Sequence, residues 1–144
     1  MSDLYEDDIL LWSEQQAELL RRRASGALVN EAELDWPNLA EEIEDVGRGQ
    51  LHAVESLLMQ AMAHLLKAQA WPDARDVETW RADARLFRAQ ARRRFVPSMR
   101  NRIDIAGIYA DALNALPAAM YDLAPQALPQ DCPFTLEELL GDRR

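Results

Sequence analysis

A helix-forming stretch from Trp36 to Trp71 places the strongest constraint on what this chain can fold into. Its apolar residues recur every three or four positions, which is the spacing of one face of an α-helix. A helix of this length with one apolar face predicts a helical bundle, in which other helices cover that face. The apolar positions are Leu39, Ile43, Val46, Val54, Leu58, Ala61, Leu65 and Ala68.

The rest of the chain carries signals for further helices and none for strands. Helices are expected over residues 4–24 and 77–95. A fourth should begin at Met99 with Ser98 as its cap, and Pro117 should kink or divide it.

The C-terminal part should hold an extended loop over residues 124–133 and then a capping box, Thr135-x-x-Glu138, that opens a short helix over residues 136–140. With 144 residues the chain has the size of one domain. The expected fold is therefore one all-α domain over residues 1–144. It should hold four main helices, one of them long and central, and a short C-terminal helix.

Composition and short motifs limit the cellular compartment and the cofactors that we expect for the protein. No apolar run approaches the roughly 20 residues that span a bilayer, and the N-terminal sequence is acidic where an export signal would be basic. The single cysteine, Cys132, has no partner for an internal disulfide, which is typical of the reducing cytoplasm. No nucleotide-binding loop, Cys-x-x-Cys pair or His-Glu-x-x-His motif is present, so we expect no cofactor.

Charge is unevenly distributed within a net charge of −9. Residues 1–70 carry 14 acidic and five basic side chains, whereas residues 71–102 carry nine arginines and four acids. One face of the helix expected over residues 77–95 carries a row of four arginines, which we call the arginine stripe. It could bind an acidic protein or a phosphate backbone, or it could form ion pairs with acids of the second and fourth expected helices. The stripe consists of Arg81, Arg85, Arg88 and Arg92.

Six polar residues on the long helix form two candidate ligand-binding groups. The first is Asn38, Glu41, Glu42 and Asp45, and the second is His64 and Lys67. Glu42 and His64 are 22 residues apart, or about 33 Å along a helix, so the groups cannot form one site.

Each group also has a structural interpretation. Acids in a first helical turn are stabilised by the helix dipole, and Glu44–Arg48 is a ready ion pair. No Glu-x-x-His motif accompanies these acids, so a metal site is not expected. His64 could be a buried, hydrogen-bonded residue, or it could form an acid–base or anion-binding pair with Lys67.

Two glycines, Gly47 and Gly49, interrupt the long helix at a cost of about 1 kcal/mol each. Such a pair is found where a helix kinks, where a ligand approaches the backbone or where another helix packs closely, and we expect close packing here.

Several strings in this sequence resemble one bacterial family, the domain of unknown function 29 (DUF 29). These strings are Asn38-Leu-Ala-Glu-Glu-Ile-Glu-Asp-Val-Gly47, His64-Leu-Leu-Lys67, Trp80-Arg81 and Cys132-Pro-Phe-Thr-Leu-Glu-Glu-Leu-Leu140, together with Trp12. The resemblance spans nearly the whole chain; Phe134 stands where the family more often has Trp. It implies a compact helical protein of the cytoplasm and brings no assigned activity.

The sequence favours a non-enzymatic interaction module that binds a protein partner or a second copy of itself through its charge-segregated surfaces. An enzyme or small-ligand binder that uses the polar residues of the long helix is the alternative. A nucleic-acid regulator that uses the arginine stripe is expected less.

Overall fold

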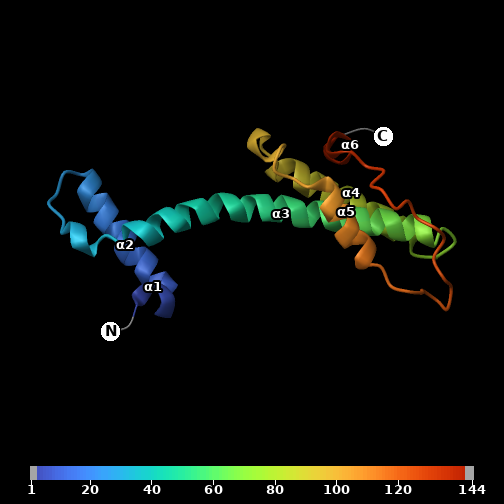
Figure 1. The fold of residues 1–144 in the computed structure, drawn as a ribbon, viewed down its shortest axis with the longest axis horizontal. Helices are drawn as coiled ribbons and strands as arrows, with labels where there is room; N and C mark the ends of the chain where they lie inside the picture. Colours follow the sequence, from blue (N-terminus) through green and yellow to red (C-terminus); the bar gives the residue numbers. More distant parts are fainter. Residues whose placement is uncertain (1–2, 142–144) are drawn as a thin grey trace. The chain divides into compact units, whose positions relative to one another are not determined.

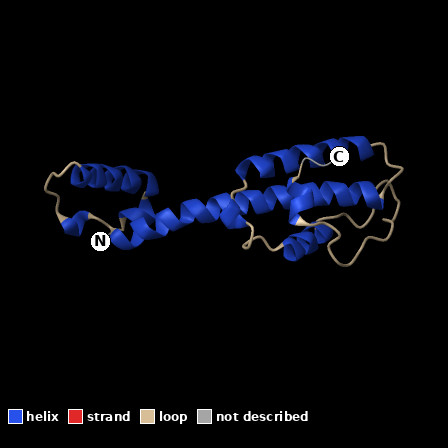
Figure 2. Cartoon of the chain, turned by 90° about the horizontal axis from the view of Figure 1, so that it is seen from above, coloured by secondary structure: helices blue, strands red, loops and turns tan. Residues whose placement is uncertain are grey.

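The protein is all-α, as expected. The computed structural model describes residues 3–141, and within that range it contains helices and no β-strand (Figures 1 and 2). The α-helices are α1 (Leu4–Asp7), α2 (Ile9–Ala24), α3 (Trp36–Ala70), α4 (Val77–Arg94), α5 (Ile105–Asn114) and α6 (Leu136–Leu140). Two 3₁₀ helices, η1 (Glu31–Glu33) and η2 (Pro97–Met99), accompany them. No helix of the described range is long and apolar enough to cross a membrane.

The long helix forms as predicted and ends one residue before Trp71. Its start is held by Asp35, whose carboxylate accepts hydrogen bonds from the side chain and the backbone of Asn38. These bonds hold the pKa of Asp35 below its usual value. The Asn38 side chain thus donates to Asp35 rather than acting as the cap itself.

Close contacts divide the chain into two compact units, Met1–Arg48 and Gly49–Arg144, and the division falls within α3. Each unit has buried residues of its own. The expectation of a single domain over residues 1–144 stays a prediction.

The first unit contains α1, α2, η1 and the first turns of α3. The single helix expected over residues 4–24 is wrong, because Asp8 leaves helical geometry with φ −154° and separates α1 from α2. Its carboxylate caps α2 by accepting from the Leu11 N–H at 3.0 Å. A side chain that satisfies a free helix-end N–H favours a new helix start over continuation of the old helix.

The buried centre of the first unit is small. Trp12 is 5% exposed, contacts Tyr5 edge-to-face at 4.9 Å between ring centroids, and donates its indole N–H to Asp35 at 3.0 Å. The buried Gln16 amide bonds to Glu33 O at 3.0 Å and accepts from Asp35 N at 2.8 Å. This unit is therefore held by a few buried side chains, those of Trp12, Leu34 and Gln16, and by directed hydrogen bonds.

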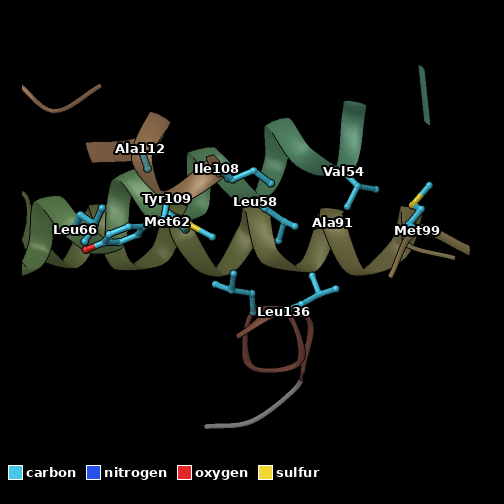
Figure 3. Packing of buried hydrophobic residues seen from close by; sticks show 11 residues of the cluster. Val54, Leu58, Met62, Leu66, Ala91, Met99, Ile108, Tyr109, Ala112 and Leu136 are labelled. Carbon is cyan, nitrogen blue, oxygen red and sulfur yellow. The ribbon is translucent and has the colours of Figure 1, made fainter. Parts of the chain in front are cut away.

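The second unit has a larger core at the C-terminal half of α3. Figure 3 shows side chains from α3, α4, α5 and α6 gathered there. Tyr109 of α5 is buried and donates its hydroxyl to Pro129 O at 2.6 Å, which ties the extended 124–133 loop to the core. The buried members are Val54, Leu58, Met62, Leu66, Ala91, Met99, Ile108, Tyr109, Ala112, Leu136 and Leu139.

Two expectations about the fourth helix are wrong. Ser98 lies within η2 and makes no capping bond, and the helix begins six residues later, at Ile105, where Asp104 accepts from Gly107 N at 3.1 Å. The helix ends at Asn114, so Pro117 neither kinks nor divides it. The capping box at Thr135 and the short helix after it are confirmed.

Candidate functional site

The first group of predicted polar residues is engaged within the first unit. Tyr5 donates its hydroxyl to Glu42 at 2.5 Å, and this bond, with the nearby acids, raises the pKa of Tyr5 to about 12. Arg48 binds Glu41 at 2.9 Å and also pairs with Asp45. The expected Glu44–Arg48 pair is replaced by these two contacts. The group therefore joins α1 to α3 and stabilises the exposed side of α3.

His64 and Lys67 contact aromatic rings of α4. The His64 ring stacks on Phe87 with 5.5 Å between centroids and 5° between planes, and Lys67 Nζ lies 6.0 Å from the centre of the Trp80 ring. The His64 Nδ1 atom is buried and has no hydrogen-bond partner among the described residues, so the expectation of a hydrogen-bonded histidine is wrong at this atom.

Burial and, next, the charge of Lys67 lower the pKa of His64, against an opposing effect of Asp83. Below the unfolded pKa of about 6.5 the unfolded chain binds a proton that the folded chain takes up less readily. The stability that His64 contributes is thus present above pH 6.5 and lost as the pH falls toward the folded value.

We therefore expect the free energy of unfolding to decrease more between pH 7 and pH 5 in the natural protein than in His64→Phe, which keeps the ring contact and cannot titrate. Urea unfolding at each pH measures this. His52→Phe, at an exposed position of the same helix, is the control and should keep the natural pH dependence. Equal slopes in His64→Phe and the natural protein would contradict the expectation.

The arginine stripe is partly used within the fold. Arg88 donates to Leu139 O at 2.9 Å and to Glu138 O at 2.8 Å, and Arg92 donates to Gly141 O at 3.2 Å. These carbonyls lie at the C-terminal end of α6, where backbone acceptors lack helical partners. Arg81 pairs with Glu78 at 2.8 Å, and Arg85 is exposed. Sequence alone did not indicate that the C-terminal helix would take up two of the four arginines.

Arg88→Met should lower the free energy of unfolding by about 1–3 kcal/mol, because a hydrogen bond from a charged group to a half-buried carbonyl contributes in that range. Arg85→Met, the matched change at an exposed position, should shift it by less than about 0.5 kcal/mol. Chemical denaturation followed by circular dichroism compares the two. Equal losses would mean that the contacts with α6 contribute nothing.

A pocket of about 490 Å³ lies beside the end of α3 and was not indicated by the sequence. The turn at Tyr121 and Asp122 forms one wall, and both residues have left-handed backbones, with φ of 52° and 62°. Tyr121 bonds to Asp76, and Leu123 O accepts the indole N–H of Trp71 at 3.0 Å. The residues that line the pocket include Trp71, Pro72, Arg75, Tyr121, Leu123 and Gln126. Within residues 3–141, no group of three or more metal-binding side chains gathers.

The apolar face of α3 is only partly covered. Val54 and Leu58 are fully buried, whereas Ile43 is 72% and Val46 is 69% exposed. A Cβ atom built at Gly47 or Gly49 would meet nothing within 4 Å, so the close packing expected there is absent from the described structure. We call Ile43, Val46 and Gly47 the α3 mid-face.

Comparison with known proteins finds similarity to a protein and a family whose functions are unknown. A crystal structure at 1.45 Å of an α-helical protein of unknown function from Rhodospirillum rubrum is similar, with a TM-score of 0.71 and 32% identity. The match covers 99% of this chain and 92% of that one. None of the curated proteins matches the sequence. The family model described as "Domain of unknown function DUF29" matches residues 4–143, and the chain therefore belongs to the DUF29 family.

Proposed function

We propose that this protein is a non-enzymatic helical interaction module whose docking surface for protein is the α3 mid-face. The observation that supports this is the exposure of two large apolar side chains, Ile43 at 72% and Val46 at 69%, next to each other on one side of a helix. Fully burying a side chain of this kind is worth about 1.5–3 kcal/mol. Burial of both side chains against a partner would therefore contribute several kcal/mol of binding free energy, which the chain alone does not obtain from them.

The glycine in the mid-face supports the same proposal. Gly47 costs the helix about 1 kcal/mol relative to alanine, and nothing within the described fold approaches it. A partner helix could come closer to α3 at a residue that has no side chain. The cost that Gly47 imposes on the folded chain would then be offset in the complex.

Binding of a small ligand at His64 and Lys67 is a second candidate, favoured by the buried Nδ1 atom of His64 that has no partner in the described fold. A ligand donor group could satisfy that atom. A thermal-shift screen would support this candidate if a compound stabilised the natural protein and did not stabilise His64→Phe. Nucleic-acid binding has less support, because Arg88 and Arg92 already bind the end of α6.

We also propose that the protein works in the bacterial cytoplasm. The support is the single, free Cys132, which fits a reducing compartment, together with the bacterial origin of the similar crystal structure.

The test is recovery of the tagged protein from nuclease-treated lysate of its source cells, compared with Ile43→Gln/Val46→Gln. Glutamine keeps helix propensity and removes the apolar surface. We expect one protein in near-equal amount with the natural chain and its loss with the double variant. Leu10→Gln, a matched change at a 68% exposed site of α2, should not reduce recovery. The same proteins recovered with the double variant would contradict the mid-face as the docking surface.

A further inference from the structure

We infer that the partner of the α3 mid-face is a second copy of this chain, which docks through the outer face of its α4. This inference rests on the proposed function and names the occupant of the same surface. It is carried by the opposite charges that surround two exposed apolar sites of one sequence, one in each unit.

The α3 mid-face has an acidic border. Residues 36–48 carry four acidic side chains and one basic side chain. Glu44 is exposed and lies next to Ile43 in the sequence, whereas Glu41 and Asp45 are partly neutralised by Arg48. An approaching surface should therefore present an apolar centre with positive charge beside it.

The outer face of α4 presents that combination. α4 carries six arginines and two acids, and Leu86 on its surface is 54% exposed. Arg85 precedes Leu86, and Arg93 lies seven residues after it on the same side of the helix; both are exposed. We define the α4 outer face as Arg85, Leu86 and Arg93. Arg88 and Arg92 bind the carbonyls at the end of α6, whereas within residues 3–141 no hydrogen bond joins Arg85 or Arg93 to α6.

The two surfaces complement each other in both respects that matter for specific docking. Leu86 can cover Ile43 and Val46, while Arg85 and Arg93 meet the acidic border. Because every copy carries both surfaces, each copy in an assembly can make the contact twice, once through each surface. A contact of like with like would bring acid to acid at the mid-face or arginine to arginine at α4.

The test is sedimentation velocity on the purified full chain at low and high salt. We expect the natural protein to associate and to dissociate more readily as salt rises, since surface charge attraction is screened. Ile43→Gln/Val46→Gln and Arg85→Glu/Arg93→Glu should each weaken association by tenfold or more. Arg22→Glu, an exposed arginine of α2, is the matched control and should associate as the natural chain does.

A mixing experiment identifies the pair of surfaces. Glu44→Arg and Arg85→Glu should each associate poorly alone, because each places like charges together. An equal mixture of the two should associate better than either, since one contact in the mixed dimer joins an arginine at position 44 to a glutamate at position 85. Absence of this recovery would overturn the assignment of the α4 outer face.

The outcomes separate this inference from the proposed function. A chain that stays monomeric at low salt, while a different protein is lost from the lysate recovery with Ile43→Gln/Val46→Gln, overturns the second-copy inference and leaves the docking surface standing. Self-association that Ile43→Gln/Val46→Gln does not weaken overturns the second-copy inference, and unchanged recovery of proteins from lysate with the same double variant overturns the docking surface as well.

Discussion

Trp12→Ala should unfold most of the structure formed by residues up to Arg48. Removing a buried tryptophan costs about 3–5 kcal/mol. A folded chain is stable by about 0.05–0.15 kcal/mol per residue, so a unit of this length has only roughly 2–7 kcal/mol available. Trp12 also supplies the indole N–H that binds Asp35 at the start of α3. Few other buried residues remain in the unit to compensate.

Hydrogen exchange resolved by peptide measures this result. Peptides from α2 should lose protection in Trp12→Ala, whereas Trp36→Ala, at a tryptophan that is 46% exposed, should leave them protected. Unchanged protection of α2 in Trp12→Ala would contradict the central place of this side chain.

The same measurement tests the expectation of a single domain. If peptides around Leu58 lose protection together with α2, the two compact units unfold as one cooperative domain. If they stay protected, the units are separately stable parts of the chain.

Local signals predicted α3, α4 and α6 to within one residue at each end. For α3 and α6 the deciding information lies within a few positions of the boundary. Asp35 precedes α3, Thr135 and Glu138 form a reciprocal cap at α6, and Gly141 follows it. Short-range hydrogen bonds of this kind depend little on the rest of the fold.

The errors arose where two local signals competed. The run of acids at Asp3, Glu6, Asp7 and Asp8 fits one helix start, yet Asp3 and Asp8 each cap a separate helix. Ser98 and Asp104 are both residue types that cap helices well. The helix starts at the second of them, and Met99, which follows Ser98, is instead buried at 5% exposure against core residues that are distant in the sequence. Tyr121 and Asp122 take left-handed backbones without the glycine or asparagine that usually indicates them.

For the candidate site residues, too, features set by the local helix could be predicted and features set by distant contacts could not. That the two polar groups of the long helix are separate could be predicted from helical rise alone, and α3 is continuous between them. The hydrogen-bond partners of the candidate site residues could not be predicted, because they lie far away in the sequence. Tyr5 donates to Glu42 across 37 positions, and Arg88 of α4 donates to Leu139 across 51. Exposure of the α3 mid-face also depends on which helices cover α3, and periodicity does not show that.

Leu58→Ala should lower the free energy of unfolding by about 2–5 kcal/mol. Leu58 is fully buried among side chains from several helices, and removing its three carbons leaves a cavity that the close-packed core fills only in part (Figure 3). Urea denaturation followed by circular dichroism gives the value. Leu86→Ala, at a leucine that is 54% exposed, should change it by less than about 0.5 kcal/mol.

Ile43→Ala gives the most informative comparison, because Ile43 and Leu58 belong to one apolar face by sequence spacing. Ile43 is 72% exposed, so its truncation should leave the stability of the isolated chain within about 0.5 kcal/mol of the natural value. A loss near that of Leu58→Ala would mean that the folded chain itself covers Ile43, which would remove the α3 mid-face as a docking surface. A small loss, measured at a concentration where the chain is monomeric, leaves Ile43 without a role in folding. Its apolar side chain is then free to contact the partner that we propose for the α3 mid-face.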